Sequence, residues 1–115
     1  MSDAQTLFAM VPVKDFRAAV AWYGRLFGRP ADAIVNDDEL MWRVTPNAWL
    51  YLIYDEVHAG NALVAIAVAN LDKTLTDIRR RGIPCGTIEL LGEAGRKATL
   101  NDIEGNVVNL VQVSA

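Results

Sequence analysis

Cysteine is almost absent from this sequence, since Cys85 is the only one in 115 residues. A single cysteine excludes an internal disulfide, so we expect a reducing, cytoplasmic environment. Cys85 follows Ile83 and Pro84 and has no base beside it in the sequence. We therefore interpret it as a small buried or strand-edge residue rather than an activated thiol.

Positive charge and long apolar segments are also scarce. The 11 Lys and Arg residues are outnumbered by 14 Asp and Glu residues, for a net charge of −3. Without a basic stripe to displace counterions, no nucleic-acid partner is expected, and we interpret the run Arg79–Arg81 as the end of a helix. The longest apolar run, 62–69, is far too short to cross a membrane, and residues 1–5 lack the features of a signal peptide. No membrane association is expected.

Hydrophobic residues, by contrast, are abundant. They make up 52% of the chain, and charged residues make up only 22%. Disorder requires the opposite balance, so the chain is expected to bury a core. Its length is that of one ordinary domain, and we assign residues 1–115 to a single one.

Apolar patterning predicts seven strands and two helices. The strands are expected at Leu7–Val13, Leu40–Val44, Ala48–Tyr54, Ala62–Ala69, Ile83–Leu90, Arg96–Asn101 and Val107–Val113. The first helix follows an N-cap at Asp15 and stops at Gly28, and the second follows Asn70 and stops at Gly82. Residues 55–61 are polar and are interpreted as a linker.

An internal repeat relates the two halves of the chain. An offset of 55 residues maps the end of the first strand, the helix cap and the helix stripe of one half onto those of the other. The pairs are Val11 and Ile66, Val13 and Val68, Asp15 and Asn70, Phe16 and Leu71, Val20 and Leu75, and Tyr23 and Ile78. Two copies of a βαβββ unit are therefore predicted, at about 5–56 and about 61–115. A ferredoxin-like sandwich ranks second, because fewer strands normally follow each of its helices.

Four segments carry a resemblance to a known family. They are Val13–Phe16, Trp22–Gly28, Val68–Asp72 and Gly95–Asn106, the last with Ile103 where proline is usual. In order and spacing they resemble the glyoxalase/bleomycin-resistance (vicinal oxygen chelate) superfamily over nearly the whole chain. The resemblance implies an α+β fold in which two βαβββ modules form one curved mixed sheet with a concave cleft.

The resemblance also implies where a metal would bind. Metal-dependent members place ligands on four strands, and the matching positions here are Phe8, Tyr51, Leu63 and Asn109. Phe8 and Leu63 offer only hydrocarbon, and Asn109 alone cannot hold a divalent cation. We therefore expect no metal and no other cofactor, and interpret the four positions as lining a ligand cleft.

Aromatic residues cluster on and before the strand Ala48–Tyr54. Strand alternation places Trp49, Tyr51 and Ile53 on one face and Leu50, Leu52 and Tyr54 on the other. If Tyr51 lines the cleft, Trp49 lies beside it, and Trp42 is a candidate third wall. These rings suit stacking with a flat apolar ligand, although they would equally suit filling the groove or a dimer interface.

Two polar residues have two interpretations each. His58, the only histidine, is expected to be an exposed linker residue, since no carboxylate is placed by spacing to orient it. Its alternative role is that of a ligand or general base, because imidazole titrates near neutrality. Arg96 is a candidate anion anchor in the cleft, or a surface residue of a hairpin.

The favoured function is therefore a metal-free protein that binds a small apolar or aromatic molecule, as in the antibiotic-sequestering branch of the family. The first alternative is a metal-independent enzyme of the same fold that uses Tyr51, Arg96 or His58. The second is a regulatory or interaction module whose groove is filled by its own side chains. The family resemblance, the hydrophobic content and exposed sheet edges also predict a homodimer, in which one cleft is built from one chain or from two.

Overall fold

The computed structural model describes residues 1–114, which form an α+β fold of two similar halves. In chain order the elements are β1 Leu7–Val13, α1 Phe16–Phe27, β2 Ala33–Asn36, β3 Glu39–Thr45, β4 Ala48–Tyr54, β5 Leu63–Ala67, α2 Leu71–Arg80, β6 Glu89–Leu90, the short 3-10 helix η1 Gly92–Ala94, β7 Gly95–Asn101 and β8 Val107–Val113. We call β1 to β4 with α1 module one, and β5 to β8 with α2 module two. The predicted fold class is confirmed, since each module has the order βαβββ.

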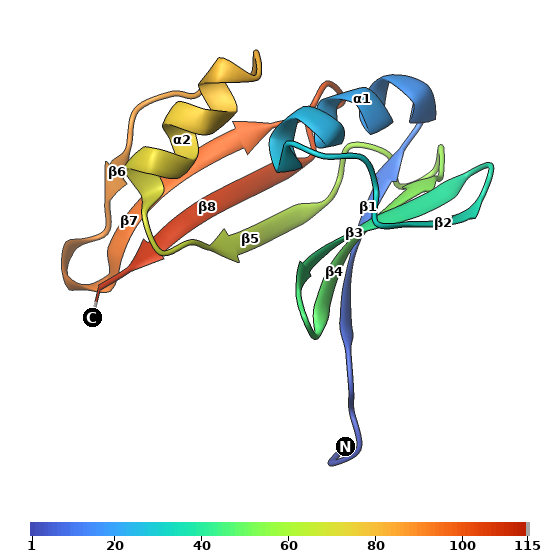
Figure 1. Cartoon of the computed structure of the whole chain (residues 1–115), viewed down its shortest axis with the longest axis horizontal. Helices are drawn as coiled ribbons and strands as arrows, with labels where there is room; N and C mark the ends of the chain where they lie inside the picture. The colour runs from blue at the N-terminus through green and yellow to red at the C-terminus, as the bar shows by residue number, and fades with distance from the viewer. Residues whose placement is uncertain (115) are drawn as a thin grey trace.

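Each module contains a four-stranded mixed sheet, and the two sheets have the same topology. The strand orders are β1-β4-β3-β2 in sheet one and β5-β8-β7-β6 in sheet two. In each, the first strand runs parallel to the last and the remaining pairs are antiparallel. The sequence predicts one curved sheet, but these two hydrogen-bonded ladders are separate. The modules meet instead through their helices and turns, with both helices on the same side (Figure 1).

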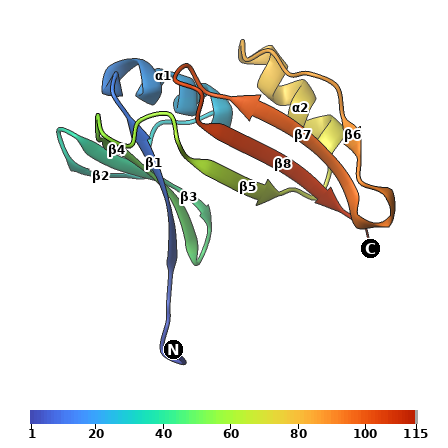
Figure 2. The ribbon, with the colours of Figure 1, turned by 180° about the vertical axis from the view of Figure 1, so that it is seen from behind.

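Strand alternation decides which side chains form the core. In sheet one, Val11, Val13, Leu50 and Leu52 are fully buried on the side that faces α1. The corresponding residues of sheet two, among them Val108, join the same continuous core. Burying each such side chain contributes about 1.5–3 kcal/mol. Because α1 and α2 share this core, the two modules pack as one body, while the N-terminal end of β1 projects away from it (Figure 2).

Both helices begin as the sequence predicts. The side chain of Asp15 accepts a hydrogen bond from the Ala18 amide, and that of Asn70 accepts one from the Lys73 amide. Gly28 ends α1 in the left-handed region at φ 70°, where a residue without Cβ is favoured. Within residues 1–114, neither helix is long and apolar enough to span a membrane.

Two strand predictions needed correction. The segment 83–90 was predicted to be a strand throughout, but only Glu89 and Leu90 pair, with β7. Pro84 has no amide hydrogen for a ladder and Gly86 favours irregular backbone, which explains the short pairing. No pattern in the sequence predicts β2, a short strand at the edge of sheet one in which all residues but Ala33 are exposed.

The turn between β7 and β8 fastens module two to the start of α1. Both carboxylate oxygens of Glu104 accept hydrogen bonds from backbone amides that precede α1, those of Lys14 and Asp15, at 2.7 and 2.8 Å. The side-chain amide of Asn106 donates to the Pro12 carbonyl at 3.0 Å. The segment Gly95–Asn106, which carries part of the family resemblance, therefore connects module two to module one by hydrogen bonds.

Module two also holds the other end of α1. The guanidinium of Arg81, just after α2, donates hydrogen bonds to the carbonyl oxygens of Arg25 and Leu26 in the last turn of α1. A cation at a helix C-terminus and a carboxylate at its N-terminus both complement the helix dipole. Arg81, the last residue of the basic run that follows α2, therefore also stabilises α1.

Candidate functional site

Sheet one turns one face away from the helices, and we call this the open face. Its apolar residues come from β1, β3 and β4 and alternate with the core residues along each strand: they are Phe8, Met10, Pro12, Met41, Trp49, Tyr51 and Ile53. The prediction that Trp49, Tyr51 and Ile53 lie opposite Leu50 and Leu52 is confirmed. Phe8 and Met10 are 45% and 47% exposed, so the face offers accessible apolar surface.

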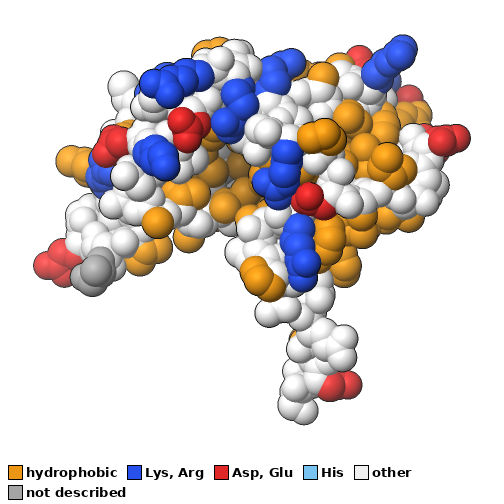
Figure 3. Space-filling model, viewed as in Figure 1, with side chains coloured by type: hydrophobic (Ala, Val, Ile, Leu, Met, Phe, Trp, Pro, Cys, Tyr) orange, Lys and Arg blue, Asp and Glu red, His pale blue; other side chains and the backbone are white. Residues whose placement is uncertain are grey.

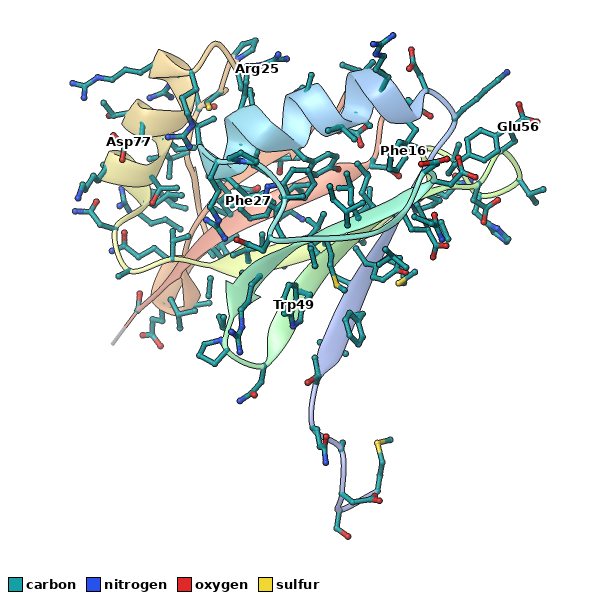
Figure 4. The ribbon with its side chains drawn as sticks, turned by 45° about the vertical axis from the view of Figure 1, so that its right-hand side comes forward. Phe16, Arg25, Phe27, Trp49, Glu56 and Asp77 are labelled. Atoms are coloured by element: carbon teal, nitrogen blue, oxygen red, sulfur yellow. The ribbon has the colours of Figure 1, made fainter. Side chains whose placement is uncertain are left out.

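The open face carries an aromatic pair, Phe8 and Tyr51. The rings of Phe8 and Tyr51 meet edge to face, with centroids 5.9 Å apart and planes at 86°. Parallel pairing of β1 with β4 sets Phe8 opposite Trp49 and Met10 opposite Tyr51, which brings these four side chains into one patch. Figure 4 labels Trp49 on β4, and the guanidinium of Arg43 lies 5.4 Å from the centre of its ring.

A short polar network fixes the Tyr51 ring in place. The Tyr51 hydroxyl donates to Glu39 at 2.7 Å, and the Asn36 side-chain amide donates to the other Glu39 oxygen, also at 2.7 Å. The bond from Asn36, followed by that from Tyr51, lowers the pKa of Glu39. The bond to Glu39 in turn raises the pKa of Tyr51. At neutral pH the open face therefore carries a neutral phenol beside a fixed negative charge.

At its other end the open face runs into a pocket that contains the histidine. This pocket, of about 370 Å³, is lined by Met10, Pro12, Ile53, Asp55, His58, Asn61 and Ala62. Ring nitrogen Nδ1 of His58 lies 2.8 Å from a carboxylate oxygen of Asp55. The expectation that no carboxylate orients His58 was therefore wrong. The hydrogen bond from the His58 ring is the main cause of a lowered Asp55 pKa.

Two of the predicted cleft residues lie on sheet two. Leu63 on β5 is 76% exposed, and Asn109 on β8 faces the same side of its sheet as Thr99, whose hydroxyl donates to its side-chain oxygen at 2.8 Å. β5 and β8 in module two correspond to β1 and β4 in module one, the strands that carry Phe8 and Tyr51. The structure thus brings Phe8 together with Tyr51, and puts Leu63 and Asn109 on the corresponding face of the other sheet.

Trp42 and Arg96 lie elsewhere. Trp42 is fully buried on the helix side of sheet one, where it stacks on Phe27 at 5.6 Å and its indole nitrogen donates to the Arg29 carbonyl at 3.0 Å. It is a core residue because β3 pairs Trp42 directly with Leu50, and directly paired residues share a face. Arg96 points to the α2 side of sheet two and pairs with Asp72 at 3.0 Å. Neither side chain reaches the open face.

An apolar groove of about 240 Å³ lies between sheet one and β5, mostly on the side of sheet one that faces the helices. Its walls come from the ends of β1, β3 and β4 on one side and from β5 on the other, and Trp49, Ala65 and Ala67 are among its lining residues. In Figure 3, hydrophobic side chains gather in the hollow between the helices and the β3–β4 hairpin. Trp49 therefore borders both the open face and the groove.

The four positions that match metal ligands in relatives do not suit a metal ion here. Phe8 and Leu63 have no donor atom, the Tyr51 phenol is held in its neutral form, and the Asn109 oxygen accepts from Thr99. Divalent cations require several converging oxygen or nitrogen donors. Among residues 1–114, no three His, Cys, Asp or Glu side chains converge in such a group.

The sequence missed the polar members of the site. Glu39 and Asn36 belong to a segment to which the sequence patterning assigns no strand, and Asp55 belongs to the predicted linker. For Asp55 the sequence did contain a local signal. An Asp three residues before a His suits a turn in which the carboxylate accepts hydrogen bonds from the following backbone amides. Asp55 does accept from the amides of Val57 and His58.

Comparison with solved structures gives clear relatives. A glyoxalase/bleomycin resistance protein from Catenulispora acidiphila DSM 44928 is 32% identical, with 94% of this chain and 97% of that chain covered and a TM-score of 0.88. TnmS3, an antibiotic binding protein from Streptomyces sp. CB03234, is 21% identical, with 99% of each chain covered and a TM-score of 0.77. A lactoylglutathione lyase from Agrobacterium tumefaciens is 15% identical, with 92% and 91% covered and a TM-score of 0.73. No protein-family model and no curated protein matches the sequence.

Proposed function

Since the chain belongs to the glyoxalase/bleomycin resistance protein superfamily, we propose that it binds a flat, largely apolar small molecule on the open face of sheet one. The molecule is held without chemical change and without a metal ion. A binding protein of this kind needs only a shaped apolar surface that removes its ligand from water.

The observation that carries this proposal is the Phe8–Tyr51 pair. Two rings at 86° offer a ligand one ring face and one ring edge, and the hydrogen bond to Glu39 fixes the Tyr51 ring before any ligand arrives. A side chain that is already ordered loses less conformational entropy on binding. Trp49 extends the same surface toward the groove between the modules.

The names of the relatives fit this proposal. TnmS3 is described as an antibiotic binding protein, and the Catenulispora protein as a glyoxalase/bleomycin resistance protein. TnmS3, at 21% identity, and the lactoylglutathione lyase, at 15%, each share only the fold with this chain, and the lyase keeps the enzyme alternative open. The donor-poor positions Phe8 and Leu63 favour a binding role over metal-dependent catalysis.

Naphthol methyl ether, a flat molecule without a hydrogen-bond donor, is a suitable first probe. We expect equilibrium dialysis to show binding that Tyr51→Ala weakens about tenfold, because loss of stacking on one ring removes about 1–3 kcal/mol. Binding is also expected to change the tryptophan fluorescence, since Trp49 borders the site. A mass spectrum of any small molecule that copurifies would identify the natural ligand.

Tyr54→Ala is the matched control. Tyr54 belongs to the same strand but alternates onto the opposite side from Tyr51, so its removal is expected to leave probe affinity within about twofold. Equal affinity of the wild-type protein and Tyr51→Ala would contradict the proposed site. Conversion of a bound ligand to product would favour the metal-independent enzyme.

A second copy of the chain is the proposed partner. Leu7, Leu63 and Val113 are 70%, 76% and 65% exposed, so each leaves apolar area in contact with water. They lie on β1, β5 and β8, and both β1 and β5 are edge strands with unpaired backbone groups. A homodimer would cover this surface.

A further inference from the structure

The strongest unassigned feature of the molecule is the contact between His58 and Asp55. Their side chains meet at 2.8 Å in the loop that joins the two modules. Asp55 is held by the loop itself, because its other carboxylate oxygen accepts from the amides of Val57 and His58 at 3.0 and 3.2 Å. The carboxylate is therefore fixed, and it fixes the imidazole ring in turn.

This contact determines which form the neutral imidazole takes. A neutral imidazole carries one proton, and a carboxylate accepts a hydrogen bond but cannot donate one when ionised. Nδ1 therefore holds the proton and donates it to Asp55. Nε2 is left as a hydrogen-bond acceptor, and within residues 1–114 no partner contacts it. The Asp55 carboxylate also makes Nε2 a stronger acceptor, as in the carboxylate–histidine pairs that support metal ligands.

The His58 ring lies next to the proposed ligand surface. His58 lines the pocket of about 370 Å³, which is also lined by Met10, Pro12 and Ile53. These three residues continue the strands that carry Phe8 and Tyr51, on the same open face. The His58 side chain is 71% exposed, so a ligand can reach it. Met10 pairs with Tyr51 and also lines this pocket, so the aromatic pair and the imidazole border one continuous surface that a single ligand can span.

We propose that His58, oriented by Asp55, accepts a hydrogen bond from a phenolic hydroxyl of the bound molecule and so selects hydroxylated aromatic ligands over their ethers. The inference rests on the proposed function and adds the chemical class of the ligand. The aromatic pair provides affinity for any flat ring system. The imidazole distinguishes hydroxylated ligands from ethers, because Nε2 accepts a hydrogen bond only from a ligand that has a donor. An ether oxygen has no proton to give, so it makes no hydrogen bond to Nε2.

Naphthol and its methyl ether form the matched pair of probes. We expect wild-type protein to bind naphthol about tenfold more tightly than the ether, which is the discrimination of one hydrogen bond to a well-placed acceptor. His58→Gln and Asp55→Asn are both expected to reduce this ratio toward one. Glu56→Gln is the control, because it removes a carboxylate from the same loop (Figure 4) without touching the imidazole, and it is expected to keep the ratio.

A second readout comes from the fact that His58 is the only histidine. In nitrogen-15 NMR spectra the ring signals therefore belong to His58, and their couplings to the ring protons tell Nδ1 from Nε2, which shows which nitrogen carries the proton. Naphthol is expected to shift the Nε2 signal and the ether to leave it in place. A proton on Nε2 in the free protein would overturn the inference.

The outcomes separate the two proposals. Binding of both probes with equal affinity, or a ratio unchanged in His58→Gln, would overturn this inference and leave the open-face site intact. Failure of the wild-type protein to bind either probe would contradict the proposed function and this inference with it. A ratio lost in Glu56→Gln as well would mean that loop charge, rather than the oriented imidazole, discriminates between the probes.

Discussion

The hydroxyl of Tyr23 in α1 donates a 2.8 Å hydrogen bond to the carboxylate of Asp102 in the β7–β8 turn, 79 residues away. Both residues are buried, at 0% and 4% exposure. Asp102 also accepts from the backbone amides of Glu104 and Asn106 and from the Asn106 side chain. One buried carboxylate thus shapes its own turn and ties it to the helix of the other module.

Tyr23→Phe is expected to lower the free energy of unfolding by about 1.5–3 kcal/mol, the usual range for a hydrogen bond to a charged group. The change removes only the hydroxyl, so the ring still fills the core. Urea denaturation followed by circular dichroism measures it. Tyr54→Phe, at an exposed tyrosine, is expected to change stability by less than about 0.5 kcal/mol. Equal stability of the two variants would mean that the Tyr23 contact contributes nothing.

Alkaline pH is expected to destabilise the protein through the same residue. Burial, and then the charge of Asp102, raises the pKa of Tyr23 far above its ordinary value. In the unfolded chain tyrosine ionises near pH 10, so the stabilisation is complete below that pH and is lost as the pH rises further. The loss is expected to approach about 1.4 kcal/mol per pH unit. Urea unfolding at a series of alkaline pH values should show a steeper decline for the wild type than for Tyr23→Phe.

Glu104→Ala is expected to cost about 1–2 kcal/mol of stability, because two backbone amides before α1 lose their acceptor. Glu104→Gln keeps one oxygen acceptor and loses the charge, so a smaller loss is expected. Glu93→Ala, at an exposed position in η1, provides the comparison. A Glu93→Ala loss as large as that of Glu104→Ala would contradict the capping role.

The purified protein is expected to contain no stoichiometric divalent metal. The reason is the chemistry at the four inherited ligand positions, of which Phe8 and Leu63 have no donor atom. Elemental analysis after mild purification tests this expectation. About one equivalent of zinc, nickel, iron or manganese per chain would refute it.

A homodimer is expected in solution, since exposed apolar residues lie on β1, β5 and β8. Light scattering at micromolar concentration should give twice the mass of one chain. A single-chain mass of 12.6 kDa that does not change with concentration would refute the homodimer.

Local patterns in the sequence determined much of the fold. Asp15 and Asn70 cap their helices because their side chains bond amides three residues away, and Gly28 ends α1 because it tolerates a positive φ. Period-two alternation likewise separated Trp49 and Tyr51 from Leu50. These features depend on neighbours within a few residues, so they can be predicted without the fold.

What only the tertiary structure decided depends on pairs that are distant in sequence. Alternation within β3 leaves open which of its two faces is buried, and the pairing of Trp42 with Leu50 places that indole in the core. The bonds from Tyr23 to Asp102, from Glu104 to the start of α1 and from Tyr51 to Glu39 have no local signal, because an isolated carboxylate in a turn is usually solvated. The sequence by itself therefore determined both helices, most of the strands and the family resemblance. Strand pairing within each module and packing between the modules determined which polar groups meet, because long-range contacts form only when both partners are already held in place.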